Sequence, residues 1–534
     1  MAEQLSLFGL PEPEEAPKSA APAAALAQPE PAAELIAAYA SVVLDIPTRA
    51  LSEPFAYGIP RSLANEAQIG STVLVHFGNR AAAGYIVDIA PELADLQGNN
   101  ALDPSRIKPV EAILSKPLFT AEAARIARWM SREYVATLSE CLRLFLPPGG
   151  SPRVVKGDDG SWSVERPAVK PIQNRWVMLT PEGFDYTPPK TAVRQRQLIE
   201  ALQCGPVTTR DLNLLYNSMS ATIKALEKRG VVVVEERRAW RGCSEQTTLS
   251  SASGKAPVAL TNGQQQALAQ IERARLDAHG DVVLVDGVTG SGKTEVYLSA
   301  IERVLAAGRS ACVLVPEISL TPQMIEAFSA YFGDAVAVLH SGLPLSERYD
   351  EWKRIRAGLA RVVVGTRSAV FAPMENLGLL IIDEEQEDTY KSESTPRYHA
   401  RDVAKFRCAQ HRALLLLGSA TPDVVSRYYA ETGRYHYFTL PDRFNARKLP
   451  DVIIADMKQE LRNGNSGSIS SVLYAELEEN LRRGEQSILF LNRRGASKLV
   501  TCAECGATYS CPNCSVSLTY HQGNQMLVCH HCGY

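Results

Sequence analysis

The sequence lacks the features that mark membrane and secreted proteins. No apolar run reaches the roughly 18 residues that a membrane-spanning helix needs, so no span is predicted. The N-terminus has no basic segment followed by an apolar core, which excludes a predicted secretory signal, and we expect a cytoplasmic protein without membrane contact. Charge of one sign is also scarce, with a net of only −3. Residues 1–36 hold six Glu and one Lys, a net of −5, which leaves +2 for the rest (−3 minus −5), so any DNA-binding surface must be local.

What is present is typical of a multidomain globular protein. Apolar residues make up 45% and charged residues 22% of 534 residues, a length that suffices for about three to five domains. Residues 1–37 are rich in Ala, Pro and Glu, a composition that predicts a disordered tail. Within it, Gln4-Leu-Ser-Leu-Phe8 resembles the pentapeptide with which many bacterial replication proteins dock on the sliding clamp. The alternative is a solvated tail with three exposed apolar residues.

Residues 38–150 predict a β-rich module. A strand is expected at 40–46, and two short strands at 70–80 and 83–88 are expected to form a hairpin. The module is predicted to close with a helix over 121–133, for which Thr120 is the N-cap.

Residues 151–250 predict a winged-helix domain. The segment opens with a loop rich in Gly, Asp and Ser. Three helices and then a strand follow, at 194–202, 207–216, 218–229 and 231–237. Domains with this order of elements bind DNA in many proteins and bind only protein in others, and both interpretations stay open.

Residues 255–440 predict a RecA-like, doubly wound α/β lobe, which makes the whole chain a multidomain α/β protein. Short apolar segments alternate with helical ones, as expected of parallel strands that are covered on both faces. The predicted strands are 282–285, 311–315, 336–339, 361–364, 377–382 and 413–417. Ligands of such lobes bind at the carboxyl ends of the strands, and the polar motifs of this chain lie there.

A glycine-rich loop follows the first of these strands. It comprises Gly287, Val288, Thr289, Gly290, Ser291, Gly292, Lys293 and Thr294, which together match the phosphate-binding pattern G-x-x-x-x-G-K-[ST] in full. Glycines let backbone N–H groups close around phosphates; Lys293 is predicted to reach the β- and γ-phosphates of ATP and Thr294 to hold Mg²⁺. Gln264, ahead of the loop, is predicted to read the adenine edge. The alternative is a glycine turn before an ordinary helix.

Acidic and hydroxyl residues end two other predicted strands. Asp383 is predicted to hold Mg²⁺ through its shell, and Glu384 to orient the attacking water. Residues Gly418–Pro422 include hydroxyls that can hydrogen-bond the acidic motif and sense phosphate release. Alone, each of these motifs is also typical of a solvated turn.

Basic and aromatic residues in the same lobe predict contacts with a DNA strand. Arg367 lies in a hydroxyl-containing loop after a strand, which suits phosphates. Tyr390, Lys391, Arg397 and Tyr398 alternate rings with positive charges, which suits base stacking and backbone contact. An ordinary amphipathic surface is the alternative.

Residues 441–534 predict the start of a second helicase lobe with a metal-binding insertion. A strand with basic residues at its carboxyl end is expected at 487–495. Three Cys-x-x-Cys pairs follow, at Cys502 and Cys505, Cys511 and Cys514, and Cys529 and Cys532. Two such pairs make one tetrahedral zinc site, with redox cysteines or an iron site as alternatives. One pair is left over, to be completed by histidines or by a missing fourth pair. We therefore expect the chain ending at Tyr534 to be a fragment.

These motifs together resemble the primosomal protein N′ (PriA) family of bacterial replication-restart helicases. The resemblance runs from about Ala38 to the last residue and is strongest in Gly287–Tyr297, Val315–Gln323, His340–Gly342, Gly365–Ala369, Tyr398–Asp402 and Leu491–Gly495. It implies an ATP-dependent motor that moves 3′ to 5′ on DNA and an N-terminal module that captures the 3′ end of a nascent strand. It also implies two zinc ions, one on Cys511, Cys514, Cys529 and Cys532 and the other on Cys502, Cys505 and a pair beyond this end.

The chain departs from the family pattern at three places. Gln386 replaces the usual His after the acidic motif, which puts the coupling of hydrolysis to DNA in question. Ala56 replaces the usual Asp in the 3′-end pocket, between Phe55 and Tyr57, which puts the grip on a 3′-hydroxyl in question. The later helicase motifs, including the arginine finger of the second lobe, are absent from these residues.

The functional prediction is an ATP-dependent 3′ to 5′ DNA helicase that recognises abandoned forks and initiates primosome assembly. Forked and single-stranded DNA, other primosome proteins and single-stranded DNA-binding protein are the expected partners, and a monomer is expected. The competing class is a fork-binding scaffold that assembles the primosome without unwinding DNA, because the later helicase motifs are absent. A nuclease-linked or transcription-coupled translocase would need a further module.

Overall fold

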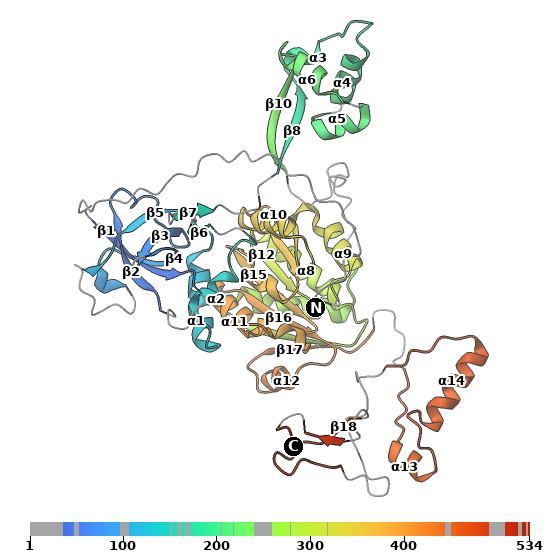
Figure 1. Ribbon diagram of the computed structural model, residues 1–534. Helices are drawn as coiled ribbons and strands as arrows, with labels where there is room; N and C mark the ends of the chain where they lie inside the picture. The colour runs from blue at the N-terminus through green and yellow to red at the C-terminus, as the bar shows by residue number, and fades with distance from the viewer. Residues whose placement is uncertain are drawn as a thin grey trace, which may run out of the picture. The chain divides into compact units, whose positions relative to one another are not determined.

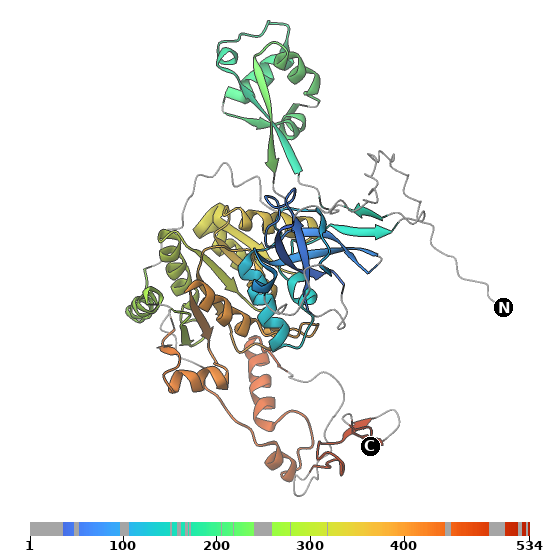
Figure 2. The same cartoon turned by 90° about the vertical axis from the view of Figure 1, so that its left-hand side faces the viewer.

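The computed structural model divides into two units, Met1–Ala446 and Arg447–Tyr534, and each is described by itself (Figures 1 and 2). The description covers residues 36–46, 53–78, 80–96, 106–149, 152–156, 162–165, 169, 172–203, 205–216, 218–239, 259–277, 279–317, 319–443, 450–490, 508–521, 526–529 and 532–534. In those ranges, no helix combines the length and the apolar character that crossing a membrane requires.

The β-rich module is a five-stranded antiparallel sheet in the order β2-β1-β4-β3-β5. Its strands are β1 (Ile36–Leu44), β2 (Phe55–Pro60), β3 (Thr72–Phe77), β4 (Arg80–Ala90) and β5 (Val110–Ile113). The predicted hairpin is confirmed, since β3 pairs with β4 from Phe77 opposite Arg80. Two helices follow, α1 (Ala121–Glu133) and α2 (Leu138–Arg143). The bounds of α1 are those predicted. The predicted Thr120 cap is also confirmed, since the Thr120 hydroxyl accepts from the backbone N–H of Ala123.

The winged-helix segment contains a long strand that the sequence interpretation missed. β8 (Ile172–Leu179) pairs antiparallel with the predicted last strand, β10 (Val232–Ala239), and with β9 (Val207–Thr208). The helices of this segment are α3 (Pro181–Phe184), α4 (Val193–Gln203), α5 (Thr209–Tyr216) and α6 (Ser220–Glu227). Leu198, Leu212 and Leu226 from three of them form its core together with Val177 of β8.

The prediction that this segment opens with a loop is wrong in part. β6 (Arg153–Lys156) and β7 (Trp162–Glu165) pair antiparallel there, and β6 lies beside β4 of the β-rich module. Each strand has only four residues, and Val154 and Val155 are adjacent in β6, so the segment gives no sustained alternation that would predict a strand.

The RecA-like lobe is confirmed as a seven-stranded, all-parallel sheet in the order β13-β14-β12-β15-β16-β11-β17. Its strands are β11 (Val282–Gly287), β12 (Ser310–Leu314), β13 (Val336–Leu339), β14 (Val362–Gly365), β15 (Leu377–Asp383), β16 (Leu414–Ser419) and β17 (His436–Leu440). The six predicted strands are all present, and β17 was missed because its alternating polar residues do not form an apolar run.

Helices cover both faces of this sheet (Figure 1). They are α7 (Asn262–Leu276), α8 (Lys293–Ala306), α9 (Pro322–Phe332), α10 (Leu345–Arg356), α11 (Ala400–His411) and α12 (Val424–Glu431). Val283 and Val285 of β11 pack on the α7 and α8 side. Leu284 faces the opposite core, which α11 shares with α1 and α2 of the β-rich module. One apolar core therefore extends from the lobe into the module, while the module's sheet has a second cluster of its own around Val42, Ile59 and Val73.

The second unit has little regular structure in its described residues. It contains α13 (Met457–Arg462), α14 (Ser471–Arg483) and a small ribbon of β18 (Thr519–His521) and β19 (Met526–Val528). The strand predicted at 487–495 is wrong where it can be checked: residues 487–490 are irregular, and Ile488 and Phe490 are 95% and 85% exposed. A buried strand needs a ladder partner, and this segment has none within the described part of the unit. Residues 491–495 lie outside it.

Candidate functional site

The glycine loop connects the carboxyl end of β11 to the first residue of α8. Gly290 and Gly292 have φ values of 80° and 77°, a backbone region that side chains other than glycine rarely adopt. A Cβ on Gly292 would lie 2.3 Å from Nε2 of Gln264, so packing also requires glycine there. A glycine loop that leads into a helix in this way suits an anion, which the helix dipole and backbone N–H groups at the start of α8 favour.

Lys293 and Glu384 lie close together at the carboxyl ends of the strands. The Lys293 Nζ donates to the carbonyl of Gly287 at 2.8 Å and lies 3.8 Å from Oε1 of Glu384. Glu384 has a φ of 47°, a backbone conformation that costs about 1–3 kcal/mol in a residue other than glycine. Strain of this kind is typical of functional sites.

Asp383 is held by a tyrosine that the sequence interpretation did not single out. The hydroxyl of Tyr297, a fully buried residue of α8, donates to Oδ1 of Asp383 at 3.0 Å. Burial raises the pKa of Asp383 and the neighbouring charge of Glu384 adds to this rise, while Tyr297 and Lys293 oppose it. A carboxylate that is costly to ionise when alone is well suited to bind a cation. Tyr297 lies one helical turn after Lys293, so the i, i+4 spacing was the signal that could have identified it.

Gln386 connects the acidic motif to the Gly418–Pro422 loop. Its Nε2 donates to Oε2 of Glu384 at 2.9 Å, and its Oε1 accepts from the hydroxyl of Ser419 at 2.5 Å. A carboxylate only accepts, so the orientation of the amide is fixed by its partners. This departure from the family pattern therefore still provides a hydrogen-bonded path between the two motifs.

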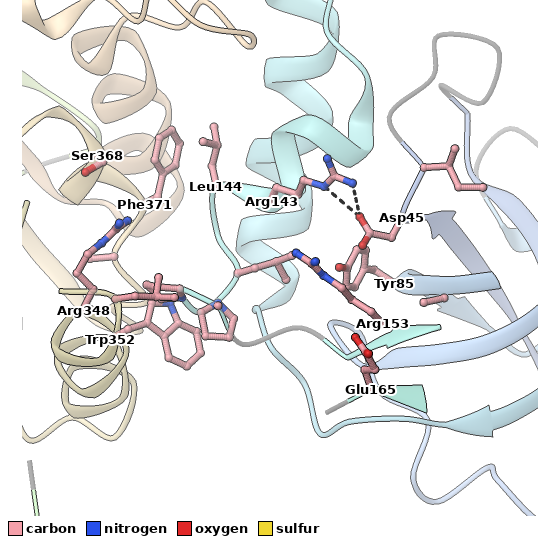
Figure 3. A pocket seen from close by; sticks show the side chains of 18 of the residues that line it. Asp45, Tyr85, Arg143, Leu144, Arg153, Glu165, Arg348, Trp352, Ser368 and Phe371 are labelled. Atoms are coloured by element: carbon pink, nitrogen blue, oxygen red, sulfur yellow. Dashed lines mark hydrogen bonds and ion pairs between the residues drawn. The ribbon is translucent and has the colours of Figure 1, made fainter. Parts of the chain in front are cut away.

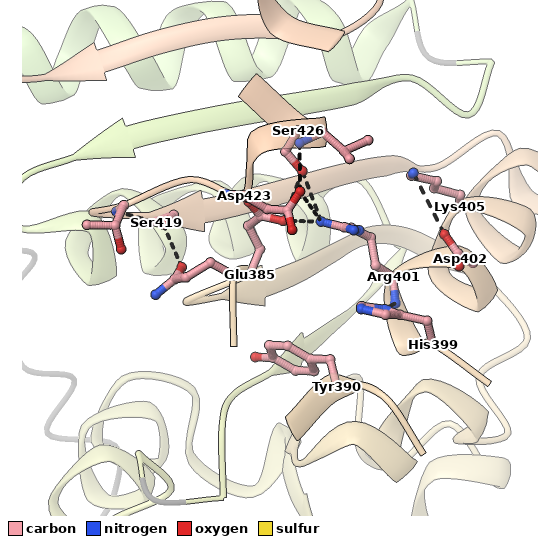
Figure 4. Close-up of polar contacts among 12 residues, drawn as sticks. Glu385, Tyr390, His399, Arg401, Asp402, Lys405, Ser419, Asp423 and Ser426 are labelled. Carbon is pink, nitrogen blue, oxygen red and sulfur yellow. Dashed lines mark hydrogen bonds and ion pairs between the residues drawn. The ribbon is translucent and has the colours of Figure 1, made fainter. Parts of the chain in front are cut away.

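A buried ion pair joins the acidic motif to α11 and α12 (Figure 4). Nη1 of Arg401 lies 2.6 Å from Oε2 of Glu385, whose side chain is fully buried. The same carboxylate accepts from the Ser426 hydroxyl at 2.9 Å and from the backbone N–H of Asp423 at 2.8 Å. Arg401 and Glu385 therefore fix the direction in which the acidic strand end points.

Gln264 is buried beside the glycine loop. Its Nε2 donates to the carbonyl of Ser291 at 2.8 Å, and its Oε1 accepts from the backbone N–H of Thr261 at 2.9 Å in a capping box. Both amide atoms are thus engaged with protein, and the adenine contact remains a prediction.

The residues predicted to contact DNA separate into two groups. Lys391 and Arg397 are exposed, and Arg367 donates to the carbonyls of Thr389 and Lys391. The prediction for Tyr390 and Tyr398 is corrected, because their side chains are only 1% and 4% exposed and belong to the core of the lobe. The Tyr390 hydroxyl donates to the carbonyls of Leu314 and Asp383, so this ring supports the acidic strand end and is not accessible for base stacking.

Ala56 of the β-rich module occupies an apolar position. It packs with Tyr39 and Ile107 against a small cluster around Leu93. Next to it, the Tyr57 hydroxyl donates to the carbonyl of His76 at 3.1 Å, and burial raises the pKa of Tyr57 to about 12. A carboxylate at position 56 would face this cluster, and the chain provides no acid there.

Four cysteine thiols converge in the second unit. They are Cys511, Cys514, Cys529 and Cys532, whose Sγ atoms all lie within 4.8 Å of one another. Individual separations are 3.4, 3.5 and 3.8 Å, close to the roughly 3.8 Å expected between thiolates that share a tetrahedral Zn²⁺ at about 2.3 Å. The donor set and its geometry fit zinc. Cys502 and Cys505 lie outside the described residues.

Cys514→Ser is expected to remove zinc from this ribbon and to unfold it. A four-thiolate site supplies much of the folding energy of a small zinc domain, and a three-thiolate remnant binds the ion far more weakly. The measurement is zinc content by atomic absorption together with proteolysis of the 508–534 region. Cys408→Ser, at a buried cysteine of α11, is the control that keeps the zinc. Equal zinc content in both variants would rule out this site.

Comparisons with known proteins agree with this arrangement. Three domain families match: the 3′DNA-binding domain (3′BD) at residues 41–147, the DEAD/DEAH box helicase at 261–428, and the PriA DNA helicase Cys-rich region (CRR) domain at 511–534. The chain is 36% identical to the replication restart protein PriA of Bacillus subtilis (strain 168), over 93% of this chain and 67% of the relative. It is 41% identical to PriA of Treponema pallidum (strain Nichols), over 93% of this chain and 60% of the relative. Among solved structures, RecG bound to a three-way DNA junction is similar at 26% identity, with a TM-score of 0.27, over 36% of this chain and 24% of that one.

Fold and site together define a P-loop helicase lobe joined to a DNA-binding module and a cysteine-rich ribbon. The chain belongs to the PriA family of replication restart proteins. It spans between 60% and 67% of the length of the two relatives named here.

Proposed function

We propose that this chain is the fork-binding and ATP-binding portion of a 3′ to 5′ DNA helicase that initiates primosome assembly. The observation that carries the proposal is the proximity of the two motifs: Nζ of Lys293 in the glycine loop lies 3.8 Å from Oε1 of Glu384 at the acidic strand end. Membership of the PriA family and the 3′BD match support fork recognition. A cytoplasmic site of action follows from work on replicating DNA.

Each residue of the cleft has a separate task in ATP hydrolysis. Lys293 exchanges its contact with the Gly287 carbonyl for the β- and γ-phosphates, and the loop N–H groups hold the same phosphates. Asp383 and the Thr294 hydroxyl would hold Mg²⁺, which neutralises charge that develops on the phosphates. Glu384 orients the attacking water and accepts its proton. Gln386 is hydrogen-bonded to both Glu384 and Ser419, so a movement of Glu384 would be transmitted to the Gly418–Pro422 loop.

The contacts with DNA, a second zinc ion and partner proteins are proposed from the chemistry of the residues and from the resemblance to the family. Arg367, Lys391 and Arg397 bind phosphates of the DNA strand. A second zinc ion is proposed on Cys502 and Cys505 with a further pair. Primosome proteins and single-stranded DNA-binding protein are the proposed partners. The sliding clamp is proposed to bind Gln4–Phe8, which lie outside the described residues; deletion of these five residues would leave clamp affinity unchanged if the proposal is wrong.

Strand displacement tests the motor and the scaffold alternatives directly. The purified chain is mixed with ATP, Mg²⁺ and a labelled duplex that carries either a 3′ or a 5′ single-stranded tail. A 3′ to 5′ motor displaces the strand only from the 3′-tailed substrate. Binding to a fork with no ATP-dependent displacement from either substrate would instead support the scaffold.

Tyr297→Phe is expected to raise the Mg²⁺ concentration needed for half-maximal ATPase and to lower the rate about tenfold. The variant removes only the hydroxyl that orients Asp383, and a hydrogen bond to a charged group contributes roughly 1.5–3 kcal/mol. A Mg²⁺ titration of the DNA-stimulated rate measures both effects. Tyr428→Phe, at a tyrosine of α12 that is 58% exposed, is the matched control. A Tyr297→Phe titration that superimposes on the wild-type curve contradicts this role.

A further inference from the structure

A large cavity lies between the β-rich module and the RecA-like lobe, within the first unit (Figure 3). Its volume is about 990 Å³, at the upper end of the roughly 300–1,000 Å³ typical of ligand sites. Arg348, Trp352, Ser368 and Phe371 line it from the lobe, while Asp45, Tyr85 and Glu165 line it from the side of the module. No motif of the ATP cleft contributes to its walls.

Among the described residues, only one of the three arginines that line the cavity forms an ion pair. Arg143 is neutralised by Asp45, with its Nη2 2.8 Å from Oδ1. Arg153 lies opposite Glu165 in the β6–β7 ladder, and the two charges balance in the lining although no ion pair within 4.0 Å joins them in the described residues. Arg348 of α10 has no acidic side chain within 4.0 Å among the residues described. The lining therefore carries one net positive charge, the complement of one phosphodiester group.

The lobe side of the cavity is the edge at which a DNA strand is expected. His340 follows β13 directly and Ser368 lies three residues after the end of β14, so both belong to the carboxyl ends of parallel strands. Leu144, Pro148 and Leu345 add apolar wall beside them. The indole Nε1 of Trp352 is buried without a hydrogen-bond partner in the described residues. One cation, an apolar wall and an unsatisfied donor together match the chemistry of a nucleotide unit.

We propose that this cavity holds a segment of single-stranded DNA as it passes between the RecA-like lobe and the β-rich module, with a backbone phosphate on Arg348. The inference rests on the proposed function, because it assigns a path to the strand that the motor would move. It adds a site on α10 that is separate from Arg367, Lys391 and Arg397. A free mononucleotide carries the same base and phosphate groups, so it is the alternative ligand for this cavity.

Arg348→Ala is expected to weaken binding of a fluorescent oligo(dT) about fivefold at 0.1 M salt. Loss of one phosphate contact on a single strand lowers the slope of log affinity against log salt by about 0.7, and 0.7 log units is about fivefold at that salt concentration. Fluorescence anisotropy over a salt series measures both quantities without ATP. Arg273→Ala, at an exposed arginine of α7, removes the same charge from the lobe and should leave affinity and slope unchanged.

Two further measurements make the inference falsifiable even if a variant misfolds. Wild-type chain irradiated with 5-iodouracil-substituted oligonucleotide should cross-link in a peptide that contains Trp352 or Phe371; cross-links only elsewhere would overturn the site. Competition with dTMP separates the sources: displacement of the oligonucleotide by dTMP that depends on Arg348 would assign the site to free nucleotide and overturn the strand path. Since none of these measurements uses hydrolysis, a chain that binds here but fails to displace strands would reject the motor and keep the site.

Discussion

Lys293→Ala is expected to lower the DNA-stimulated ATPase rate at least about 100-fold. The Lys293 ammonium group is proposed to stabilise the negative charge that develops on the phosphates during hydrolysis. Removal of one such preorganised electrostatic contact lowers a rate by about 10²–10³. Its Nζ currently contacts the Gly287 carbonyl and lies near Glu384, so truncation removes a charge that the loop and the acidic end share. Phosphate release measured with and without single-stranded DNA provides the rate.

Two comparisons give this result its meaning. Lys458→Ala, at an exposed lysine of α13, removes the same charge from the second unit and should keep the full rate. Oligonucleotide affinity without nucleotide should be equal for Lys293→Ala and wild type, because Lys293 is proposed to contact ATP and not DNA. An ATPase rate that survives Lys293→Ala would remove the motor from this polypeptide and leave the scaffold.

The parts of the fold that could be predicted are those for which a short stretch of sequence is sufficient evidence. Parallel strands buried on both faces must be nearly continuous apolar runs, and six such runs became β11 to β16. The glycine loop was also predictable, since only its spacing lets backbone N–H groups face a phosphate. β8 and β17 contain polar residues within the strand, so no apolar run marks them.

The parts of the site that could not be predicted depend on which side chains meet in space. Tyr390 and Tyr398 lie among basic residues in the sequence, yet both rings are buried: Tyr390 bonds the acidic strand end, and Tyr398 packs edge-on against Phe371. Gln386 was recognised only as a departure, and its partner Ser419 is 33 residues away. The pairing of Glu385 with Arg401 likewise joins residues 16 apart, across the end of β15 and the start of α11. A single sequence carries no signal of such pairs.

Helix α11 connects the acidic motif of the lobe to the β-rich module. At its start, Arg401 binds Glu385 of the acidic motif. Further along, Phe406 stacks on Trp129 of α1 with ring centroids 4.6 Å apart and an interplanar angle of 10°. Arg407 and His411, one turn apart, both contact Glu122 of α1, at 3.2 and 2.8 Å. The module that is proposed to hold a 3′ end is thus anchored on the helix whose first turn holds the acidic motif.

Arg407→Ala is expected to destabilise the first unit by about 3–5 kcal/mol. Arg407 is 2% exposed, and its guanidinium also donates to the carbonyls of Val370 and Met374 at 2.8 and 3.1 Å. Truncation leaves these buried acceptors and part of the Glu122 charge uncompensated, which is the costly way to break a buried ion pair. Denaturant unfolding followed by near-ultraviolet circular dichroism, together with hydrogen exchange of α1, measures the loss. Arg125→Ala, on the exposed side of α1 where it contacts Gln410, should cost about 0.5 kcal/mol or less.

The pH dependence of stability gives an independent test of the ion pair between Arg407 and Glu122. Burial opposes ionisation of Glu122, but the hydrogen bonds and charges of His411 and Arg407 outweigh it, and the net effect lowers the pKa of Glu122 below 4.5. A lowered folded-state pKa contributes stability that is fully present above the unfolded value and is lost as the pH falls through the folded value. The stability difference between wild type and Arg407→Ala should therefore be constant from pH 6 to 8 and shrink below about pH 4.5. A difference that persists unchanged at pH 3 would mean that Arg407 acts through its two carbonyl contacts alone, and that its charge on Glu122 does not fasten the module to α11.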